Sequence, residues 1–97
     1  MAFQHVVLFR FPEPPTAEDD SYVRSSVTSW ADQIGGFRLL RIGTDTSCRA
    51  QGWHYCLVEE FDSVADFRRY VDHPVHQVFV RWVAERQIVT LAFDYEV

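Results

Sequence analysis

Alternation of apolar and polar residues at a period of two predicts four β-strands in this chain. They are expected over residues 3–11, 37–43, 53–61 and 87–95. Both faces of the first strand are rich in apolar residues, because Val6 and Leu8 lie opposite a face on which His5 alternates with Val7 and aromatic side chains. A sheet with one face in water does not need a second apolar face, so the pattern indicates that both faces are covered.

Apolar residues at helical spacing predict three helices between these strands. The first is expected to begin after Thr16, a suitable N-cap, and to run to about Ile34, where Gly35-Gly36 stops it. Its buried stripe is expected to consist of Val23, Val27, Trp30, Ala31 and Ile34. The other two helices are expected to meet near Pro74.

The junction of these two helices, at residues 70–79, holds two of the four histidines of the chain. A proline suits the first position of a helix, and the residue before it is pushed out of the α region. We therefore expect one helix to end near residues 70–72 and the next to start at Pro74. Tyr70 then lies on the last turn of the first and His76 on the first turn of the second, so that a phenol and an imidazole approach each other across the corner.

The element order β-α-β-β-α-α-β predicts an α+β fold of the ferredoxin-like type, with an antiparallel four-stranded sheet in a single domain over residues 1–97. Helices can cover only one face of such a sheet. The apolar residues of the other face need a different cover, and a second copy of the same sheet supplies one. We therefore expect a homodimer that closes a dimeric α+β barrel, sheet on sheet.

Charge narrows the choice of partners and chemistry. The chain carries a formal charge of −5 and contains no lysine. This composition argues against nucleic acid or an anionic membrane as partner, and the missing lysine excludes Schiff-base chemistry. Neither a signal peptide nor an apolar run of membrane length is present, so we expect a cytoplasmic protein. Cys48 and Cys56 are expected to be free thiols.

Two histidines and a tyrosine are the candidates for catalysis. His5 can act with His76 only if it points toward the helices, which places the site inside each protomer, between sheet and helices. An imidazole that is partly shielded there is expected to be neutral and able to remove a proton from a carbon flanked by carbonyls. The Tyr70 hydroxyl can donate to the enolate oxygen. An intramolecular aldol cyclisation of this kind needs no metal and no redox cofactor.

Each of these residues also has an ordinary structural interpretation. His76 can fix the corner between the helices by packing or capping, and His5 can be a core histidine whose ring nitrogens are hydrogen-bonded within the protein. His73 is expected to cap the third helix rather than to act in catalysis, and Asp94 to form structural hydrogen bonds. A metal site is not expected, because Pro74 interrupts the helical geometry that would aim His73 and His76 at one ion.

Several short motifs together resemble a known family. They are His5-Val6-Val7-Leu8-Phe9-Arg10-Phe11, Gly35-Gly36-Phe37, Gly43, Glu60-Phe61, Tyr70-x-x-His73-Pro74-x-His76 and Phe93-Asp94-Tyr95. The pattern resembles the stress-responsive A/B barrel (Dabb) domain across nearly the whole chain. The resemblance implies a ferredoxin-like protomer and a dimeric α+β barrel. Its members include plant stress-associated oligomers, a plant polyketide cyclase that makes olivetolic acid, and bacterial proteins without a known activity.

The resemblance also implies roles for individual residues. His76 matches the catalytic histidine of the cyclase, Tyr70 its partner tyrosine and His5 its second pocket histidine. The positions that present aromatic rings in the cyclase pocket are Val23, Arg24 and Val27 here, so the pocket is expected to have a different shape. We expect the substrate-binding residues to be Phe3, Val7, Val23, Val27, Leu57 and Phe79.

Three functions are open at this point. The first is a cofactor-independent small-molecule enzyme or binding barrel, in its most concrete form a polyketide-type cyclase with His76 as base, Tyr70 as proton donor and His5 orienting the substrate. The second is a stress-responsive dimeric barrel without catalysis. The third, by analogy of fold alone, is a cofactor-free monooxygenase.

Overall fold

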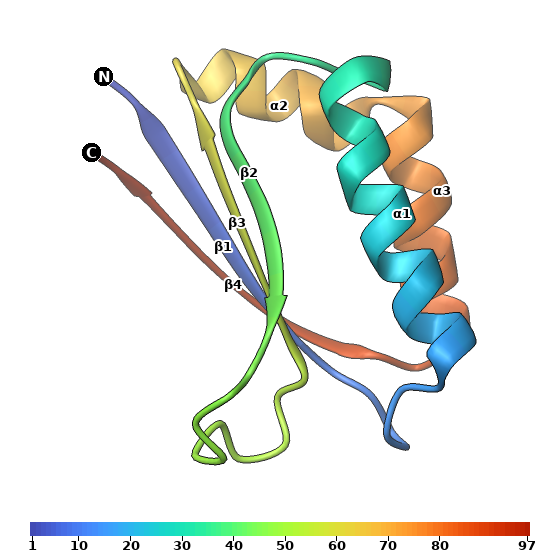
Figure 1. The fold of residues 1–97 in the computed structure, drawn as a ribbon. Helices are drawn as coiled ribbons and strands as arrows, with labels where there is room; N and C mark the ends of the chain where they lie inside the picture. Colours follow the sequence, from blue (N-terminus) through green and yellow to red (C-terminus); the bar gives the residue numbers. More distant parts are fainter.

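The computed structural model describes residues 1–97 and shows one layer of strands beside one layer of helices (Figure 1). In chain order the elements are β1 (Phe3–Arg10), α1 (Ala17–Gln33), β2 (Phe37–Thr44), β3 (Tyr55–Phe61), α2 (Val64–Asp72), α3 (Pro74–Glu85) and β4 (Val89–Glu96). The strands form one sheet in the order β2-β3-β1-β4, in which every neighbouring pair is antiparallel. The predicted ferredoxin-like α+β fold is confirmed.

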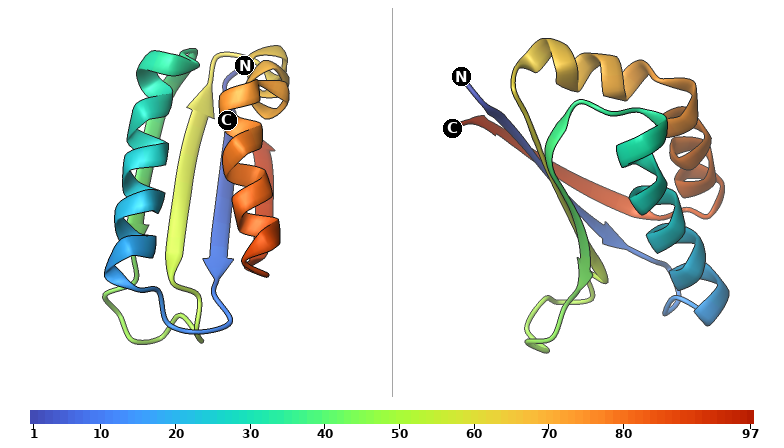
Figure 2. Two further views of the ribbon diagram at one scale, coloured as in Figure 1. Left: turned by 90° about the vertical axis from the view of Figure 1, so that its right-hand side faces the viewer. Right: turned by 45° about the horizontal axis from the view of Figure 1, so that its top comes forward.

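The helices cover one face of the sheet and leave the other free (Figures 1 and 2). The covered face buries the central aromatic and aliphatic residues, among them Trp30 of α1, Phe61 of β3 and Phe79 of α3. On the free face the side chains of Leu91 and Phe93 are 53% and 68% exposed. An apolar surface of this kind on one side of a sheet marks a site for a further partner.

The α2–α3 corner forms as the proline predicts. Helix α2 ends at Asp72, and His73 adopts an extended backbone with φ −66° and ψ 134°. Pro74 then occupies the first turn of α3, where its missing amide hydrogen costs no helical bond. Because no residue separates α2 from α3 except His73, the last turn of one helix packs against the first turn of the next.

Several local expectations differ from the structure. Strand β1 ends at Arg10 rather than Phe11, and β4 begins at Val89 rather than Gln87, because Gln87 lies in the turn after α3 with φ 57°. Strand β3 begins at Tyr55 rather than Trp53, because residues 51–52 form a turn in which the Trp53 amide donates to the Ala50 carbonyl. Ala31 is exposed, although its spacing assigned it to the buried stripe of α1. The stripe is narrower than expected, since Val27 and Trp30 fill the contact between α1 and the sheet. None of the helices combines the length and apolar character that crossing a bilayer requires.

Candidate functional site

A cavity of about 230 Å³ lies between the sheet and the helices, beside the α2–α3 corner. Its polar lining consists of His5, Tyr70, His76 and Thr90. Its apolar lining consists of Val7, Phe9, Trp30, Leu57, Phe79, Val80, Val83 and Ala92. Pockets for drug-sized ligands measure roughly 300–1,000 Å³, so this cavity suits a smaller molecule.

His76 has one ring nitrogen bound and one free. Its Nδ1 lies 3.0 Å from the backbone carbonyl oxygen of Val71. A carbonyl oxygen only accepts hydrogen bonds, so Nδ1 carries the hydrogen and Nε2 of the neutral ring keeps its lone pair. Burial lowers the pKa of His76 below its ordinary value, and the bond to Val71 offsets part of this effect. The first turn of α3 therefore carries a neutral base at the cavity wall.

Tyr70 lies against His76, with 4.1 Å between the two ring centroids. Its side chain is enclosed by aromatic rings, including those of Trp30 and Phe61 at 5.6 Å and 5.5 Å. Burial raises the pKa of Tyr70 well above its ordinary value, and the neighbouring Glu59 adds to the effect. The phenol therefore keeps its proton and can donate a hydrogen bond to a ligand oxygen.

Three polar side chains form a row across the helix-facing side of the sheet. In the antiparallel register, His5 of β1 lies directly opposite both Glu59 of β3 and Asp94 of β4. The Nδ1 atom of His5 pairs with Oδ1 of Asp94, and its Nε2 lies 3.9 Å from Oε1 of Glu59. The exposed fraction of the side chain falls from 37% at Asp94 to 12% at His5 and 0% at Glu59.

Glu59 is a fully buried acid without a hydrogen-bond partner on either carboxyl oxygen. Burial raises the pKa of Glu59 to about 8; the nearby Tyr70 hydroxyl offsets part of this rise, and the negative charge of Asp94 adds to it. The acid is therefore largely protonated at neutral pH. The sequence interpretation missed this residue. Its signal was an acid between Leu57 and Phe61, at a position that alternation places on the same apolar face.

The cavity brings together His5, Tyr70 and His76, the residues expected to act in catalysis. It also contains three of the expected substrate-binding residues, namely Val7, Leu57 and Phe79. The other three lie elsewhere: Phe3 packs on Phe67 with 4.8 Å between ring centroids, and Val23 and Val27 are enclosed in the core beneath α1. Trp30 is the residue of α1 that lines the cavity, and neither valine does.

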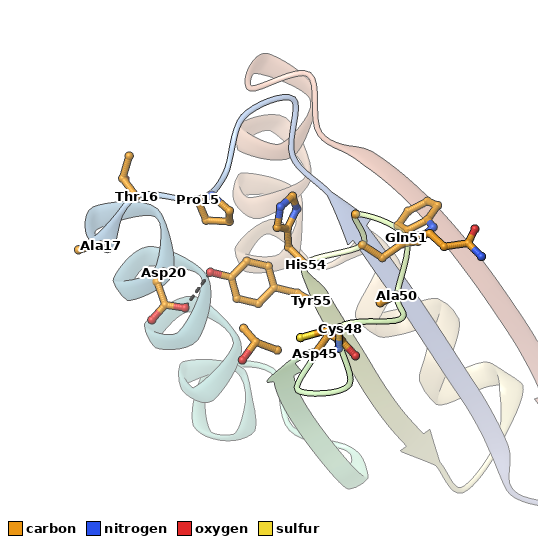
Figure 3. A pocket seen from close by; sticks show the side chains of 13 residues that line it. Pro15, Thr16, Ala17, Asp20, Asp45, Cys48, Ala50, Gln51, His54 and Tyr55 are labelled. Atoms are coloured by element: carbon orange, nitrogen blue, oxygen red, sulfur yellow. Dashed lines mark hydrogen bonds between the residues drawn. The ribbon is translucent and has the colours of Figure 1, made fainter.

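A larger hollow of about 530 Å³ lies at the other end of β3, between the 44–55 segment and the start of α1 (Figure 3). Its acidic and phenolic side chains are occupied by protein groups. The Tyr55 hydroxyl donates to Asp20 at 2.7 Å, and the Asp45 carboxylate accepts from the amides of Ser47 and Cys48. Because no free, buried titratable group faces this hollow, we place the candidate site in the smaller cavity.

The remaining histidines have structural roles. His73 is the N-cap of α3, since its Nδ1 accepts from the Val75 amide at 3.1 Å, as predicted. The Nδ1 atom of His54 accepts from the Phe11 amide at 3.1 Å. No cluster of three or more His, Cys, Asp or Glu side chains has an arrangement that could hold a metal ion, and both cysteines are free.

Solved structures from several organisms share this fold, among them the following three. A dimeric ferredoxin-like protein from Thermobifida fusca has a TM-score of 0.85 and 23% identity, with 100% of this chain and 92% of that chain covered. A dimeric protein of ferredoxin-like fold from Bacteroides fragilis has a TM-score of 0.79 and 25% identity over 99% and 96%. The hydroxynitrile lyase from Passiflora edulis has a TM-score of 0.79 and 20% identity over 98% and 94%.

At the level of sequence, no curated protein matches this chain. The family model of the stress responsive A/B barrel domain (Dabb) matches residues 3–97, and this range contains every element of the fold and every residue of the cavity. The chain therefore belongs to the stress responsive A/B barrel domain family.

Proposed function

We propose that this protein is a cofactor-independent enzyme that transfers protons to and from a small carbonyl compound, most concretely in an intramolecular aldol cyclisation of the polyketide type. The observation that carries the proposal is the state of His76. Its Nδ1 is held by the Val71 carbonyl, so that Nε2 is a free base at the wall of an apolar cavity, in ring contact with Tyr70.

The reaction uses these two groups in sequence. Nε2 of His76 takes a proton from the carbon next to a carbonyl, and the Tyr70 hydroxyl donates a hydrogen bond to the enolate oxygen that forms. The enolate carbon then bonds to a second carbonyl carbon of the same molecule, and Tyr70 protonates the resulting alkoxide. The apolar walls keep bulk water from the enolate, and this strengthens the hydrogen bond that Tyr70 donates to the enolate oxygen.

The lining of the cavity indicates a neutral substrate. No arginine faces the cavity, the chain has no lysine, and the Asp94 carboxylate lies beside His5 at the cavity wall. An anionic ligand would therefore lack a counter-charge and would meet negative potential. The volume of about 230 Å³ further favours a short diketone over a long acyl chain. A hydroxynitrile lyase on the same fold supports lyase chemistry by analogy.

A suitable probe is heptane-2,6-dione, a short neutral diketone whose aldol ring closure and dehydration give an ultraviolet-absorbing enone. We expect ring closure by the wild type, a loss of about 10²-fold or more in His76→Ala, and a loss of about tenfold in Tyr70→Phe. Deuterium uptake next to the carbonyls, followed by NMR in D₂O, reports the proton abstraction separately from the ring closure.

Tyr95→Phe is the matched control for Tyr70→Phe. Tyr95 lies on β4 and does not line the cavity, and phenylalanine keeps its apolar ring on the free sheet face, so full activity is expected. Equal rates for the wild type and a folded His76→Ala variant would assign His76 to packing. The protein would then be the non-catalytic barrel that is the alternative to an enzyme.

We also propose that two copies of the chain pair through their free sheet faces to form a homodimeric α+β barrel. This face carries exposed apolar side chains, with Phe93 68% and Leu91 53% exposed, and Val89 and Tyr95 are exposed beside them. The similar proteins from Thermobifida fusca and Bacteroides fragilis are described as dimeric. The helix layers then lie on the outside of the barrel, and each protomer keeps its own cavity.

A further inference from the structure

In the row formed by Glu59, His5 and Asp94, solvent exposure falls from Asp94 to Glu59, and only His5 and Asp94 are joined by a hydrogen bond. Asp94 at the outer end binds Nδ1 of His5, whereas Glu59 at the inner end has no hydrogen bond, and the nearest ring nitrogen, Nε2 of His5, is 3.9 Å away. The backbone register fixes the order of the three residues, because Glu59 and Asp94 occupy the strands on either side of His5.

A purely structural residue at this position would be apolar. The neighbours of Glu59 along β3 on the same face are Leu57 and Phe61, which are 2% and 0% exposed. An acid that is buried without a partner destabilises the fold, whether it is ionised or protonated, relative to an apolar side chain of similar volume. An unpartnered buried group in a native protein therefore requires an explanation such as a proton-transfer role.

We propose that Glu59 is the proton reserve of the site: it replaces the proton that Tyr70 gives to the substrate, and His5, whose tautomer Asp94 fixes, reloads it. This inference rests on the proposed function for its place in the reaction. Two of the steps follow contacts in the structure: Nε2 of His5 lies 3.9 Å from Glu59 Oε1, and Nδ1 of His5 pairs with Asp94. For the third, the Tyr70 hydroxyl lies near enough to Glu59 for each group to change the pKa of the other.

Each proton in this cycle has a source and a destination. When the Tyr70 O–H bond breaks and the alkoxide O–H bond forms, the tyrosinate takes the carboxylic proton of Glu59. Nε2 of His5, which lines the cavity, takes a proton from cavity water and transfers it to the Glu59 carboxylate. Throughout the cycle, Nδ1 of His5 keeps its hydrogen and donates it in the hydrogen bond to Asp94. The proton that His76 removed from the substrate leaves to solvent, so one proton enters and one leaves per turnover.

The first test needs no substrate. The infrared carbonyl band of a protonated carboxylic acid, assigned by its loss in a single variant, reports on Glu59. We expect this band in the wild type, its loss in Glu59→Gln and its presence in Glu60→Gln. Glu60 is the matched control, since it neighbours Glu59 in β3 but faces the other side of the sheet, 3.5 Å from Arg38. Absence of the band in the wild type would overturn the proposal.

The same band tests the route of the proton. On transfer to D₂O the band shifts as Glu59 exchanges its proton, and we expect this exchange to be slower by about tenfold or more in His5→Phe, in which the relaying nitrogen is missing. Equal exchange rates in the two proteins would exclude His5 as the group that reloads Glu59, and with it the proposed relay.

Kinetics with heptane-2,6-dione test the catalytic part. In Glu59→Gln the first turnover should proceed at the wild-type rate, because Tyr70 still starts with its proton, while later turnovers slow by about tenfold or more. Unchanged steady-state turnover would exclude a catalytic role for Glu59. If the wild type itself does not turn over the diketone, the proposed function fails on this probe, while the infrared measurements still decide whether Glu59 exchanges its proton through His5.

Discussion

At the scale of single residues, burial removes the charge from the two central titratable groups, Glu59 and His76. In mildly acidic water a free glutamate is an anion and a free histidine is a cation. Glu59, ordinarily an anion, is largely protonated, and His76 is neutral. The common cause is the loss of hydration, which penalises whichever form carries the charge. A neutral acid and a neutral base can thus coexist in one small cavity, which acid–base catalysis of a neutral substrate requires.

The protonation of Glu59 makes stability depend on pH in a defined direction. Its pKa rises from an ordinary 4.5 to about 8 on folding, so between these values the folded state binds more protons than the unfolded state. Stability from this group is therefore lost as the pH rises through that window. We expect Glu59→Gln to be more stable than the wild type by an amount that grows from about pH 5 to about pH 8. At the alkaline end the difference in unfolding free energy should be on the order of 2 to 4 kcal/mol, and thermal unfolding at each pH measures it.

Glu60→Gln is again the control, because Glu60 is partly exposed and paired with Arg38. Its difference from the wild type should stay small and nearly constant over the same range. Parallel pH profiles for Glu59→Gln and the wild type would contradict a protonated Glu59 in the folded state.

At the scale of elements, the α2–α3 corner positions both catalytic candidates. Tyr70 and His76 belong to different helices, and only His73 lies between those helices. The His73 imidazole accepts from the Val75 amide, which fixes the first turn of α3 and hence the bond between His76 and the Val71 carbonyl. The orientation of the proposed base therefore depends on an N-cap.

This dependence separates capping from catalysis at His73. Asparagine is a good N-cap and alanine is not, so His73→Ala should lose about 1 kcal/mol of stability, whereas His73→Asn should retain it. Calorimetry measures the stability, and turnover of the diketone should follow the same order in the two variants. Loss of activity in a stable His73→Asn variant would instead show that the imidazole itself takes part in the reaction.

At the scale of the whole molecule, the two faces of the sheet have different tasks. The helices cover one face and leave the other free (Figure 2). The covered face holds the cavity and the Glu59, His5 and Asp94 row, while the free face presents the apolar side chains of β4. Alternation along β4 assigns Asp94 to one face and its neighbours Phe93 and Tyr95 to the other. One strand therefore contributes to the site and to the proposed dimer contact at the same time.

A charge on the free face should separate the dimer. We expect Phe93→Asp to change the mass measured by size-exclusion chromatography with light scattering from that of two chains to that of one, because a carboxylate would be buried without a partner in the sheet-on-sheet contact. Val78→Asp is the control, since Val78 is 51% exposed on α3, on the helical side of the molecule. A wild type with the mass of one chain would contradict the proposed dimer.

The sequence by itself determined the order and type of the elements, the corner at Pro74 and the cap at His73. These features depend on local causes: side chains alternate along a strand, repeat along a helix, and a proline restricts its own neighbours. The expectations about the fold were therefore wrong only at the boundaries of elements, such as the start of β3, and at the margin of the buried stripe of α1, where Ala31 is exposed.

Only the tertiary structure decided which residues share the site. The register between strands that are far apart in the chain places Asp94 and Glu59 on either side of His5. It thereby pairs His5 with Asp94 and leaves Glu59 without a hydrogen-bond partner. The cavity likewise depends on how helices α1 and α3 pack on the sheet, since its lining comes from both helices and from β1, β3 and β4. Register and empty volume arise from packing between distant segments, and a periodic pattern in one segment carries no information about either.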